Sequence, residues 1–279
     1  MNMLRTPGDI LTPDDIGRQV DVLQGIFRRL GTHIVAAAGK LAYTTKSDNS
    51  PVTNLDVEID DAIISGFSSQ FPGMPIYGEE SGYQEGQTGT CWLIDPIDGT
   101  KSLLANVAGY TTMAVLVQHE EAVACVIYNP RDGEMYVARK DGGAFKNGQR
   151  LDLANAPLPK VAYCRERLAG AITGMLRPLG VSCEPGPTGA GYGFGLVADG
   201  RIAARFNFPH YPGGGYVHDY APGALLVREA GGKVISVEEN GDYTYRTRSF
   251  VACHPALETL VRQHAAELRQ LEIETAQRP

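Results

Sequence analysis

The amino-acid sequence predicts a mixed α+β / α/β fold. Two helical patterns precede a run of short apolar segments separated by turn sequences, which is typical of an antiparallel meander. Beyond about residue 153, short apolar segments alternate with helical patterns, as in α/β units. The length of 279 residues suits two modest halves that share a core. We expect an N-terminal α+β half over residues 1–153 and a C-terminal α/β half over residues 154–279.

Two helices are expected at the start of the chain. Thr12 followed by proline and two aspartates is a helix-start sequence, and apolar residues then recur at helical spacing to about Lys40. A second helix is expected over Asp56–Phe71, ended by the following Pro-Gly pair. The polar, turn-rich segment Lys46–Asp56 leads into it.

The strands of the first half follow from apolar runs bounded by turn residues. Met74–Tyr77 and Cys91–Ile94 are each followed directly by a short segment that contains acidic residues. Three further runs separated by turn sequences predict the meander: Thr111–Gln118, Ala122–Tyr128 and Glu134–Arg139.

The second half alternates element types. The expected elements are a strand at Val161–Arg165, a helix near Leu168–Leu179, a strand at Val181–Glu184 and an amphipathic helix at Pro255–Leu271. The glycine-rich segment Gly186–Gly200 does not have the spacing of a nucleotide fingerprint. It predicts instead a tight approach into a packed helix.

Composition and charge exclude several classes of protein. The net charge is −7 and lysines and arginines do not cluster, which excludes nucleic-acid binding over a basic surface. Apolar runs such as Met113–Val117 are too short to span a bilayer, and the N-terminus lacks the pattern of a secretory signal. The five cysteines are scattered without a C-x-x-C pair, which favours reduced thiols. We therefore expect a cytoplasmic protein.

The stretch Cys91–Leu104 carries the strongest chemical signal. Pro96 disfavours helical angles at Asp95, so Asp95 and Asp98 are expected to converge at the carboxyl end of a buried strand. Gly99-Thr100 then begins a possible helix whose free N–H groups suit an anion. Carboxylates repel a phosphate bound by the neighbouring N–H groups. The two can occupy one site when a divalent cation lies between carboxylate and phosphate.

This stretch resembles the D-P-x-D-G-T motif of the inositol monophosphatase superfamily, which comprises lithium-sensitive, magnesium-dependent phosphomonoesterases. Three other segments resemble the family's remaining motifs in the expected order. Lys46–Asp56 resembles its mobile loop and V-T-x-x-D sequence, and Gly78–Glu80 resembles G-E-E. His218–Ile235 resembles W-D-x-A-A-G followed by a helix and E-A-G-G.

The resemblance implies a magnesium centre. Glu79, Asp95 and the backbone carbonyl of Ile97 would hold one Mg²⁺, and Asp95, Asp98 and Asp219 a second, with a third weakly held ion possible near Glu79. The carboxylates are unaccompanied by a His/Cys ligand pattern, which favours Mg²⁺ over zinc. From the residues alone, Asp219 also reads as the N-cap of a helix, and the two roles are compatible.

The resemblance also implies the catalytic roles. Thr100 and Asp56, with Glu79, would orient the attacking water, and the N–H groups of Gly99 and Thr100 would bind phosphate oxygens. Lys46 would approach the metal site from the mobile loop. Such a reaction needs no Ser, Cys or His nucleophile. Taken alone, Lys46 and Asp56 read as a solvated loop and a carboxylate near a helix start.

Contacts to the organic part of the substrate are expected from two regions. The family uses the neighbourhood of Gly186–Gly200, and a distinctive loop leads into the last motif. The candidates are Ala190, Gly191, Tyr192, His210, Tyr211, Tyr216 and His218. For the four loop residues, ordinary packing is an equally good interpretation. His218 stands where the family has tryptophan, Pro222 replaces an alanine at about the third helical position, and Pro212–Gly215 interrupts the region of the acidic sugar-binding residue. These departures bear on inositol specificity.

The resemblance implies the sugar-phosphatase αβαβα layered sandwich, commonly as a homodimer, acting on a small phosphorylated metabolite such as inositol 1-phosphate. The nearest alternative is a 3′(2′),5′-bisphosphate nucleotidase, which Lys101 after D-G-T favours and the absence of a Ser/Lys pattern in Gly189–Phe194 disfavours. Histidinol-phosphate and fructose-1,6-bisphosphate phosphatases remain open. A regulatory, partner-binding protein on this fold is the non-enzymatic alternative.

Overall fold

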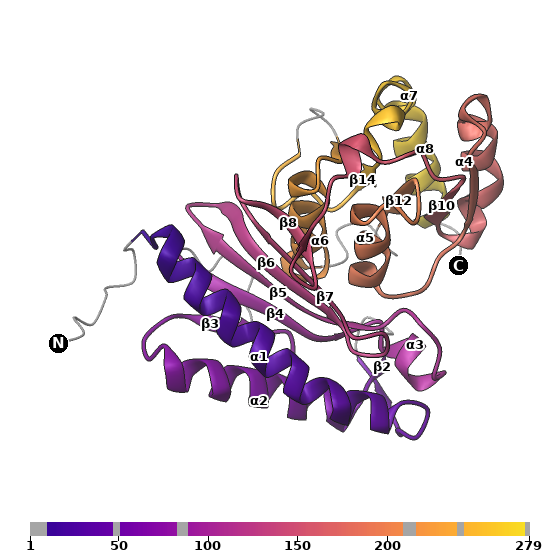
Figure 1. The fold of residues 1–279 in the computed structure, drawn as a ribbon. Coiled ribbons are helices and arrows are strands. Elements are labelled where there is room, and N and C mark those ends of the chain that lie inside the picture. The colour runs from indigo at the N-terminus through magenta and orange to yellow at the C-terminus, as the bar shows by residue number, and fades with distance from the viewer. Residues whose placement is uncertain (1–9, 47–50, 83–88, 209–215, 239–242, 277–279) are drawn as a thin grey trace.

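The protein is built from five layers, as the computed structural model shows (Figure 1). The structure describes residues 10–46, 51–82, 89–208, 216–238 and 243–276. Helices α1 (Pro13–Ala37) and α2 (Asn54–Gln70) cover one face of a seven-stranded sheet. Helices α5 (Ala190–Ala198) and α6 (Val217–Glu229) lie between this sheet and a five-stranded one. The predicted αβαβα layering is confirmed.

The outer helices of the first half begin with reciprocal capping boxes. The Thr12 hydroxyl accepts the Asp15 N–H at 3.2 Å, and the Asp15 carboxylate accepts the Thr12 N–H at 3.2 Å. Thr53 and Asp56 make the equivalent box at the start of α2. The apolar faces of both helices bury Phe27 and Ile63 against the sheet. Both helices therefore form close to where the sequence predicts them.

The seven-stranded sheet contains the predicted meander. Its order is β3-β4-β5-β6-β7-β8-β9, with β3 parallel to β4 and every later neighbour antiparallel. The strands are β3 (Ile76–Gly78), β4 (Cys91–Asp98), β5 (Thr111–Gln118), β6 (Glu121–Asn129), β7 (Glu134–Arg139), β8 (Gly143–Lys146) and β9 (Gln149–Arg150). Strand β4 continues beyond the predicted Ile94 to Asp98, and its register with β5 shifts between Asp95 and Asp98. A two-stranded hairpin, β1 (Thr44–Thr45) with β2 (Pro51–Val52), lies apart from this sheet.

The five-stranded sheet is mixed and has the order β11-β10-β12-β14-β13. Strand β10 is parallel to β11 and β12, whereas β14 is antiparallel to β12 and β13. The strands are β10 (Val161–Cys164), β11 (Ser182–Pro185), β12 (Ala204–Asn207), β13 (Lys233–Ser236) and β14 (Phe250–Cys253). Helices α4 (Ala169–Leu176), α7 (Glu258–Gln263) and α8 (Ala265–Ala276) lie on its outer side (Figure 1).

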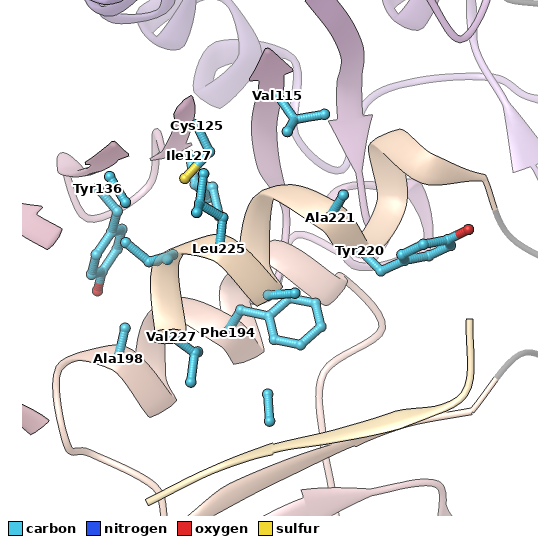
Figure 2. Close-up of a cluster of buried hydrophobic side chains, with 14 of the residues drawn as sticks. Val115, Cys125, Ile127, Tyr136, Phe194, Ala198, Tyr220, Ala221, Leu225 and Val227 are labelled. Atoms are coloured by element: carbon cyan, nitrogen blue, oxygen red, sulfur yellow. The ribbon is translucent and has the colours of Figure 1, made fainter. Parts of the chain in front are cut away.

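The two sheets share a core around α5 and α6. Figure 2 shows Val115 and Ile127 of the first sheet near side chains of α6. On the other side, the rings of Phe194 and Phe250 stack with centroids 5.8 Å apart. One continuous cluster of buried side chains thus joins both sheets. The expected division of the chain near residue 153 stays a prediction.

Two local predictions are wrong. Pro222 is the sixth residue of α6 and lies inside the helix, because α6 already begins at Val217. The C-terminal helical segment is not continuous, since the chain leaves helical geometry at His264 (φ −103°, ψ 12°) between α7 and α8. A short 3₁₀ turn, Pro255–Leu257, precedes α7.

The helices and the cysteines bear on two predictions from composition. None of the helices in the described residues combines the length and hydrophobicity needed to cross a bilayer. All five cysteines lie in the described residues, and each is buried with a free thiol.

Candidate active site

A cavity of about 800 Å³ is lined by residues from both halves of the chain. Seven of its lining residues are acidic. Glu80 and Glu166 are two of them, and the other five are the predicted site residues Asp56, Glu79, Asp95, Asp98 and Asp219. They come from the start of α2, the residue after β3, the end of β4 and the start of α6. Segments more than a hundred residues apart in the sequence therefore meet at one place.

Asp95 is the most deeply placed carboxylate of this group, with 3% of its surface exposed. Its Oδ1 atom is buried and accepts no hydrogen bond from the described residues. Burial raises the pKa of Asp95 well above its usual value, and the negative charges of Glu79, Asp98 and Asp219 raise it further. An ionised Asp95 in this position needs a compensating positive charge.

Asp98 is fixed by the first residues of α5. The backbone N–H of Ala190 donates to its Oδ1 and that of Gly191 to its Oδ2, each at 2.8 Å. The Thr111 hydroxyl also donates to Oδ2 at 2.8 Å. Burial raises the pKa of Asp98 to about 6, an effect that these donors and the charge of Arg205 oppose. Both oxygens thus have a defined orientation at the N-terminus of a helix.

The backbone approach around Asp98 requires glycine. A Cβ atom on Gly191 would lie 2.3 Å from the Met113 sulfur and 2.5 Å from the Thr111 hydroxyl oxygen. One on Gly189 would lie 2.9 Å from the Asp98 Oδ2 atom. The glycine-rich sequence therefore brings the amides of α5 close to the end of β4.

Thr100 and Asp56 are in direct contact. The Thr100 hydroxyl lies 3.1 Å from Asp56 Oδ1 and 3.1 Å from the carbonyl oxygen of Ile97, and it can donate to either. The other Asp56 oxygen accepts the Thr53 N–H at 2.8 Å. Burial raises the pKa of Asp56, and its hydrogen bonds to Thr53 and Thr100 oppose this rise. The Asp56 carboxylate therefore both caps α2 and holds the Thr100 hydroxyl in place.

Lys46 lies within the acidic cluster. Its ammonium is 2.7 Å from Glu79 Oε1 and also forms an ion pair with Glu80. Although burial alone lowers the pKa of Lys46, these two carboxylates raise it overall. Glu79 itself follows β3 and donates its backbone N–H to the Ile94 carbonyl at 3.0 Å. Lys46 therefore compensates part of the negative charge at Glu79.

The start of α6 brings Asp219 and His218 to the same place. His218 Nε2 lies 3.4 Å from Asp219 Oδ1 and 3.9 Å from Glu79 Oε2. One ligand atom from each of these three residues lies within 4.8 Å of the others. His218 is 2% exposed, and burial lowers its pKa, which favours the neutral imidazole. Tyr216, directly before α6, stacks its ring on His218 with centroids 5.3 Å apart.

This donor set fits a hard divalent cation. Carboxylate oxygens dominate it, and the buried Asp95 Oδ1 atom has no protein donor among the described residues. Oxygen ligands of this kind are those that Mg²⁺ prefers. A cation would supply the positive charge that the cluster of carboxylates needs in a buried position.

Only some of the other predicted site residues line the cavity. Gly99, Thr100, Ala190 and Tyr216 line the cavity, whereas Gly191, Tyr192 and His218 are not among the described residues of its lining. Tyr192 packs at the edge of the core shared by the sheets. His210 and Tyr211 lie outside the described residues. The roles of all these residues stay predictions.

Sequence reasoning missed four residues at the cavity or its acidic cluster. Thr111 hydrogen-bonds to Asp98, and Arg165, Arg167 and Arg205 line the cavity. One signal was available for Arg205, which stands in the otherwise apolar stretch Ile202–Phe206. An arginine within such a strand indicates a special environment, because arginine is rarely buried without a partner.

Comparisons with known proteins agree with this architecture. The model of the inositol monophosphatase family matches residues 15–271. The Nus factor SuhB of Vibrio cholerae is 30% identical over 254 residues, which cover 86% of this chain and 92% of that protein. The 3′(2′),5′-bisphosphate nucleotidase CysQ of Buchnera aphidicola is 29% identical over 198 residues, covering 68% of this chain and 72% of that protein.

A similarity in structure covers nearly the whole chain. A Thermotoga maritima IMPase superposes with a TM-score of 0.77 at 21% identity, covering 93% of this chain and 99% of that one. At this identity the similarity shows the fold. Together with the family match over residues 15–271, it shows that the chain belongs to the inositol monophosphatase family.

Proposed function

We propose that the protein is a Mg²⁺-dependent phosphomonoesterase that hydrolyses a small phosphorylated metabolite, with inositol 1-phosphate as the reference substrate. Family membership supports a phosphatase. The observation that carries the proposal is the buried Asp95, whose Oδ1 atom accepts no hydrogen bond from the described residues while Glu79, Asp98 and Asp219 raise its pKa. Such an arrangement favours a bound hard cation.

The proposed ion ligands are four carboxylates and one backbone carbonyl. One Mg²⁺ would be bound by Glu79, Asp95 and the Ile97 carbonyl. A second would be bound by Asp95, Asp98 and Asp219. A third ion would bind weakly near Glu79. Asp98 Oδ1 accepts only the Ala190 N–H and keeps a further lone pair, whereas Oδ2 already accepts two hydrogen bonds, from Gly191 and Thr111. When bound, such ions lower the pKa of a coordinated water and compensate the charge of the phosphate.

The chain's own groups would place water and phosphate. The Thr100 hydroxyl, held by Asp56 and close to the Ile97 carbonyl, would orient the attacking water. Backbone N–H groups of Gly99 and Thr100, at the start of α3 (Thr100–Leu104), would hold phosphate oxygens. Lys46 would change partners as the ions bind, because it now pairs with Glu79.

The organic part of the substrate would meet Ala190 and Tyr216 at the cavity wall. Three alternatives use the same chemistry on other substrates: a 3′(2′),5′-bisphosphate nucleotidase, a histidinol-phosphate phosphatase and a fructose-1,6-bisphosphate phosphatase. The relative named Nus factor SuhB supports a fourth alternative, a regulatory partner-binding role. A cluster of buried carboxylates with no catalytic use would be a cost in stability, which disfavours binding as the only role.

Phosphate release tests these alternatives directly. The assay would compare inositol 1-phosphate, adenosine 3′,5′-bisphosphate, histidinol phosphate and fructose 1,6-bisphosphate, with and without Mg²⁺. We expect Mg²⁺-dependent release that Li⁺ inhibits and that Asp95→Asn abolishes. Asp61→Asn, at an exposed position of α2, is the matched control and should retain full activity.

Each outcome assigns a function. Release from the adenosine bisphosphate alone would move the assignment to a nucleotidase. Mg²⁺ binding without release from any of the four substrates would contradict a phosphomonoesterase and favour the regulatory role. The predicted homodimer is checked separately by light scattering of the purified protein.

A further inference from the structure

The cavity carries a second group of charges, opposite in sign to the acidic cluster. Arg165, Arg167 and Arg205 line the same cavity. All three belong to the five-stranded sheet or its connections: Arg165 directly follows β10, Arg167 lies in the short turn Glu166–Leu168, and Arg205 is in β12. The proposed hydrolysis assigns none of them a role.

Strand register places Arg165 and Arg205 on one face of the sheet. Strands β10 and β12 are parallel, with Tyr163 opposite Arg205. Side chains alternate along an extended chain, and Arg165 keeps extended angles (φ −74°, ψ 144°), so it projects to the same face as Tyr163. The carboxyl ends of parallel strands are where α/β sheets commonly bind ligands.

Arg205 is built firmly into the cavity wall. Its guanidinium lies over the Phe194 ring, 5.5 Å from the centroid, and its Nε atom is buried without a hydrogen-bond partner among the described residues. Gly193 provides the space, because a Cβ atom there would lie 2.5 Å from Arg205 Nη1. Burial lowers the pKa of Arg205, and the negative charge of Asp98 opposes this effect.

Arg165 is half-buried, and its guanidinium forms no hydrogen bond or ion pair with any described residue. Burial lowers the pKa of Arg165 to about 10, and the charges of Arg205 and Arg167 contribute to this lowering. Glu272 opposes the effect from a distance, but Glu272 already pairs with Arg269 at 2.6 Å. An anion beside Arg165 and Arg205 would relieve the repulsion between the guanidinium groups.

We propose that Arg165 and Arg205, with Arg167 at the rim, bind a second anionic group of the substrate. The substrate is then a small molecule with a phosphate or carboxylate in addition to the phosphate ester that is hydrolysed. Guanidinium groups pair with both kinds of oxyanion in a two-pronged geometry. This inference rests on the proposed function and specifies the substrate of the same cavity.

Matched substrates that differ only in the second anion test the proposal. Glycerol 3-phosphate is compared with 3-phosphoglycerate, which has a carboxylate in place of a hydroxymethyl group, and inositol 1-phosphate is compared with inositol 1,4-bisphosphate. We expect kcat/KM to be about 10- to 100-fold higher for a doubly anionic member, mainly through KM, as for a charge-assisted hydrogen bond. A preference for the carboxylate or for the second phosphate identifies which anion is bound, and either supports the proposal.

Variants of Arg165 test whether the preference for doubly anionic substrates depends on the arginine subsite. Arg165→Ala should bring the ratio of kcat/KM within each pair close to one, and Arg165→Lys should give an intermediate ratio. Arg262→Ala, in α7 and paired with Glu258, is the control and should keep the wild-type ratio. Equal kcat/KM within every pair for the wild type, or an unchanged ratio in Arg165→Ala, would overturn the proposal. If circular dichroism shows that Arg165→Ala is unfolded, Arg165→Lys decides.

Calorimetric binding to the metal-free protein separates the subsite from catalysis. The wild type should bind 2,3-bisphosphoglycerate at least about tenfold more tightly than Arg165→Ala does. Such binding without phosphate release from any substrate would refute the proposed hydrolysis and keep the subsite. Equal binding by the two proteins would refute the subsite, whatever the activity.

Discussion

At the scale of single residues, Thr100 links the end of β4 to the start of α2. Its hydroxyl lies 3.1 Å from both Asp56 Oδ1 and the Ile97 carbonyl oxygen. If it orients the attacking water, Thr100→Ala should lower kcat on the order of 10²-fold, as loss of a positioned proton-handling group does. Thr100→Ser keeps the hydroxyl and should retain most of the activity. An alanine variant with wild-type kcat would remove Thr100 from the proposed mechanism.

A second prediction at this scale concerns the effect of Asp95 on the stability of the folded protein. In the metal-free protein its buried charge opposes folding, so Asp95→Asn should raise the melting temperature or leave it unchanged. Mg²⁺ should stabilise the wild type by about 2.7 kcal/mol at a hundredfold excess over Kd, and should not stabilise Asp95→Asn.

Differential scanning fluorimetry with and without Mg²⁺ measures both effects. Asp61→Asn should behave as the wild type. A marked fall in the metal-free melting temperature of Asp95→Asn would mean that the carboxylate has a structural partner. A retained Mg²⁺ response would mean that the ions bind elsewhere.

At the scale of elements, the site depends on close packing of backbone from three segments. The Gly189 N–H donates to the Gly109 carbonyl at 3.1 Å, and a Cβ atom on Gly189 would lie 2.3 Å from that oxygen. Gly189→Ala should therefore push α5 away from Asp98, destabilise the protein by about 1–3 kcal/mol and weaken Mg²⁺ binding. Urea unfolding and calorimetric Mg²⁺ titration provide the two measurements.

Gly174→Ala is the matched control for this substitution. Gly174 lies inside α4, and a Cβ atom there would have nothing within 4 Å. Alanine should stabilise the helix by about 0.5–1 kcal/mol and leave Mg²⁺ binding unchanged. Equal stability of Gly189→Ala and Gly174→Ala would show that the backbone around Gly189 can shift without cost.

Secondary-structure elements could be predicted from the sequence wherever a short, continuous residue pattern encodes them. The meander of the first half follows from apolar runs between turn sequences, and β5 and β7 have the predicted bounds. The acidic motifs follow from short spacings such as that of Asp95 and Asp98. The meeting of Arg165 with Arg205 depends on parallel pairing between β10 and β12, which joins residues about forty apart in the chain. No local pattern encodes such a pairing.

At the scale of the whole molecule, a charged network joins the two halves of the chain. Lys146 of β8 lies 2.6 Å from Glu134 Oε1 and 2.8 Å from Asp199 Oδ2, which follows α5. Arg201 lies 2.8 Å from both carboxylates. Because Glu134 and Asp199 are largely buried, this network should stabilise the contact between the halves more than exposed ion pairs do.

The network predicts a pH dependence of stability. Burial raises the pKa of Glu134, but Arg201 and Lys146 outweigh it and the pKa is lowered from 4.5. A lowered pKa in the folded state gives stability that is present above about pH 4.5 and lost as the pH falls through the folded-state value. Glu134→Gln should thus cost about 1 kcal/mol near neutral pH and progressively less in acid.

Urea unfolding across the acidic range measures this difference between Glu134→Gln and the wild type. Glu121→Gln removes an exposed partner of Lys140 and serves as the control, with no measurable loss expected. A constant difference between the wild type and Glu134→Gln at all pH values would contradict an electrostatic origin and point to packing.

Helix α6 comes late in the chain, yet it fills the space between the sheets and carries Asp219. During synthesis, Asp56, Glu79, Asp95 and Asp98 leave the ribosome long before Asp219 does. A nascent polypeptide arrested before Val217 therefore lacks both Asp219 and the side chains that α6 packs between the sheets. If the proposed metal centre needs Asp219, such a truncated polypeptide should hydrolyse none of the phosphate esters on which the proposed activity would act.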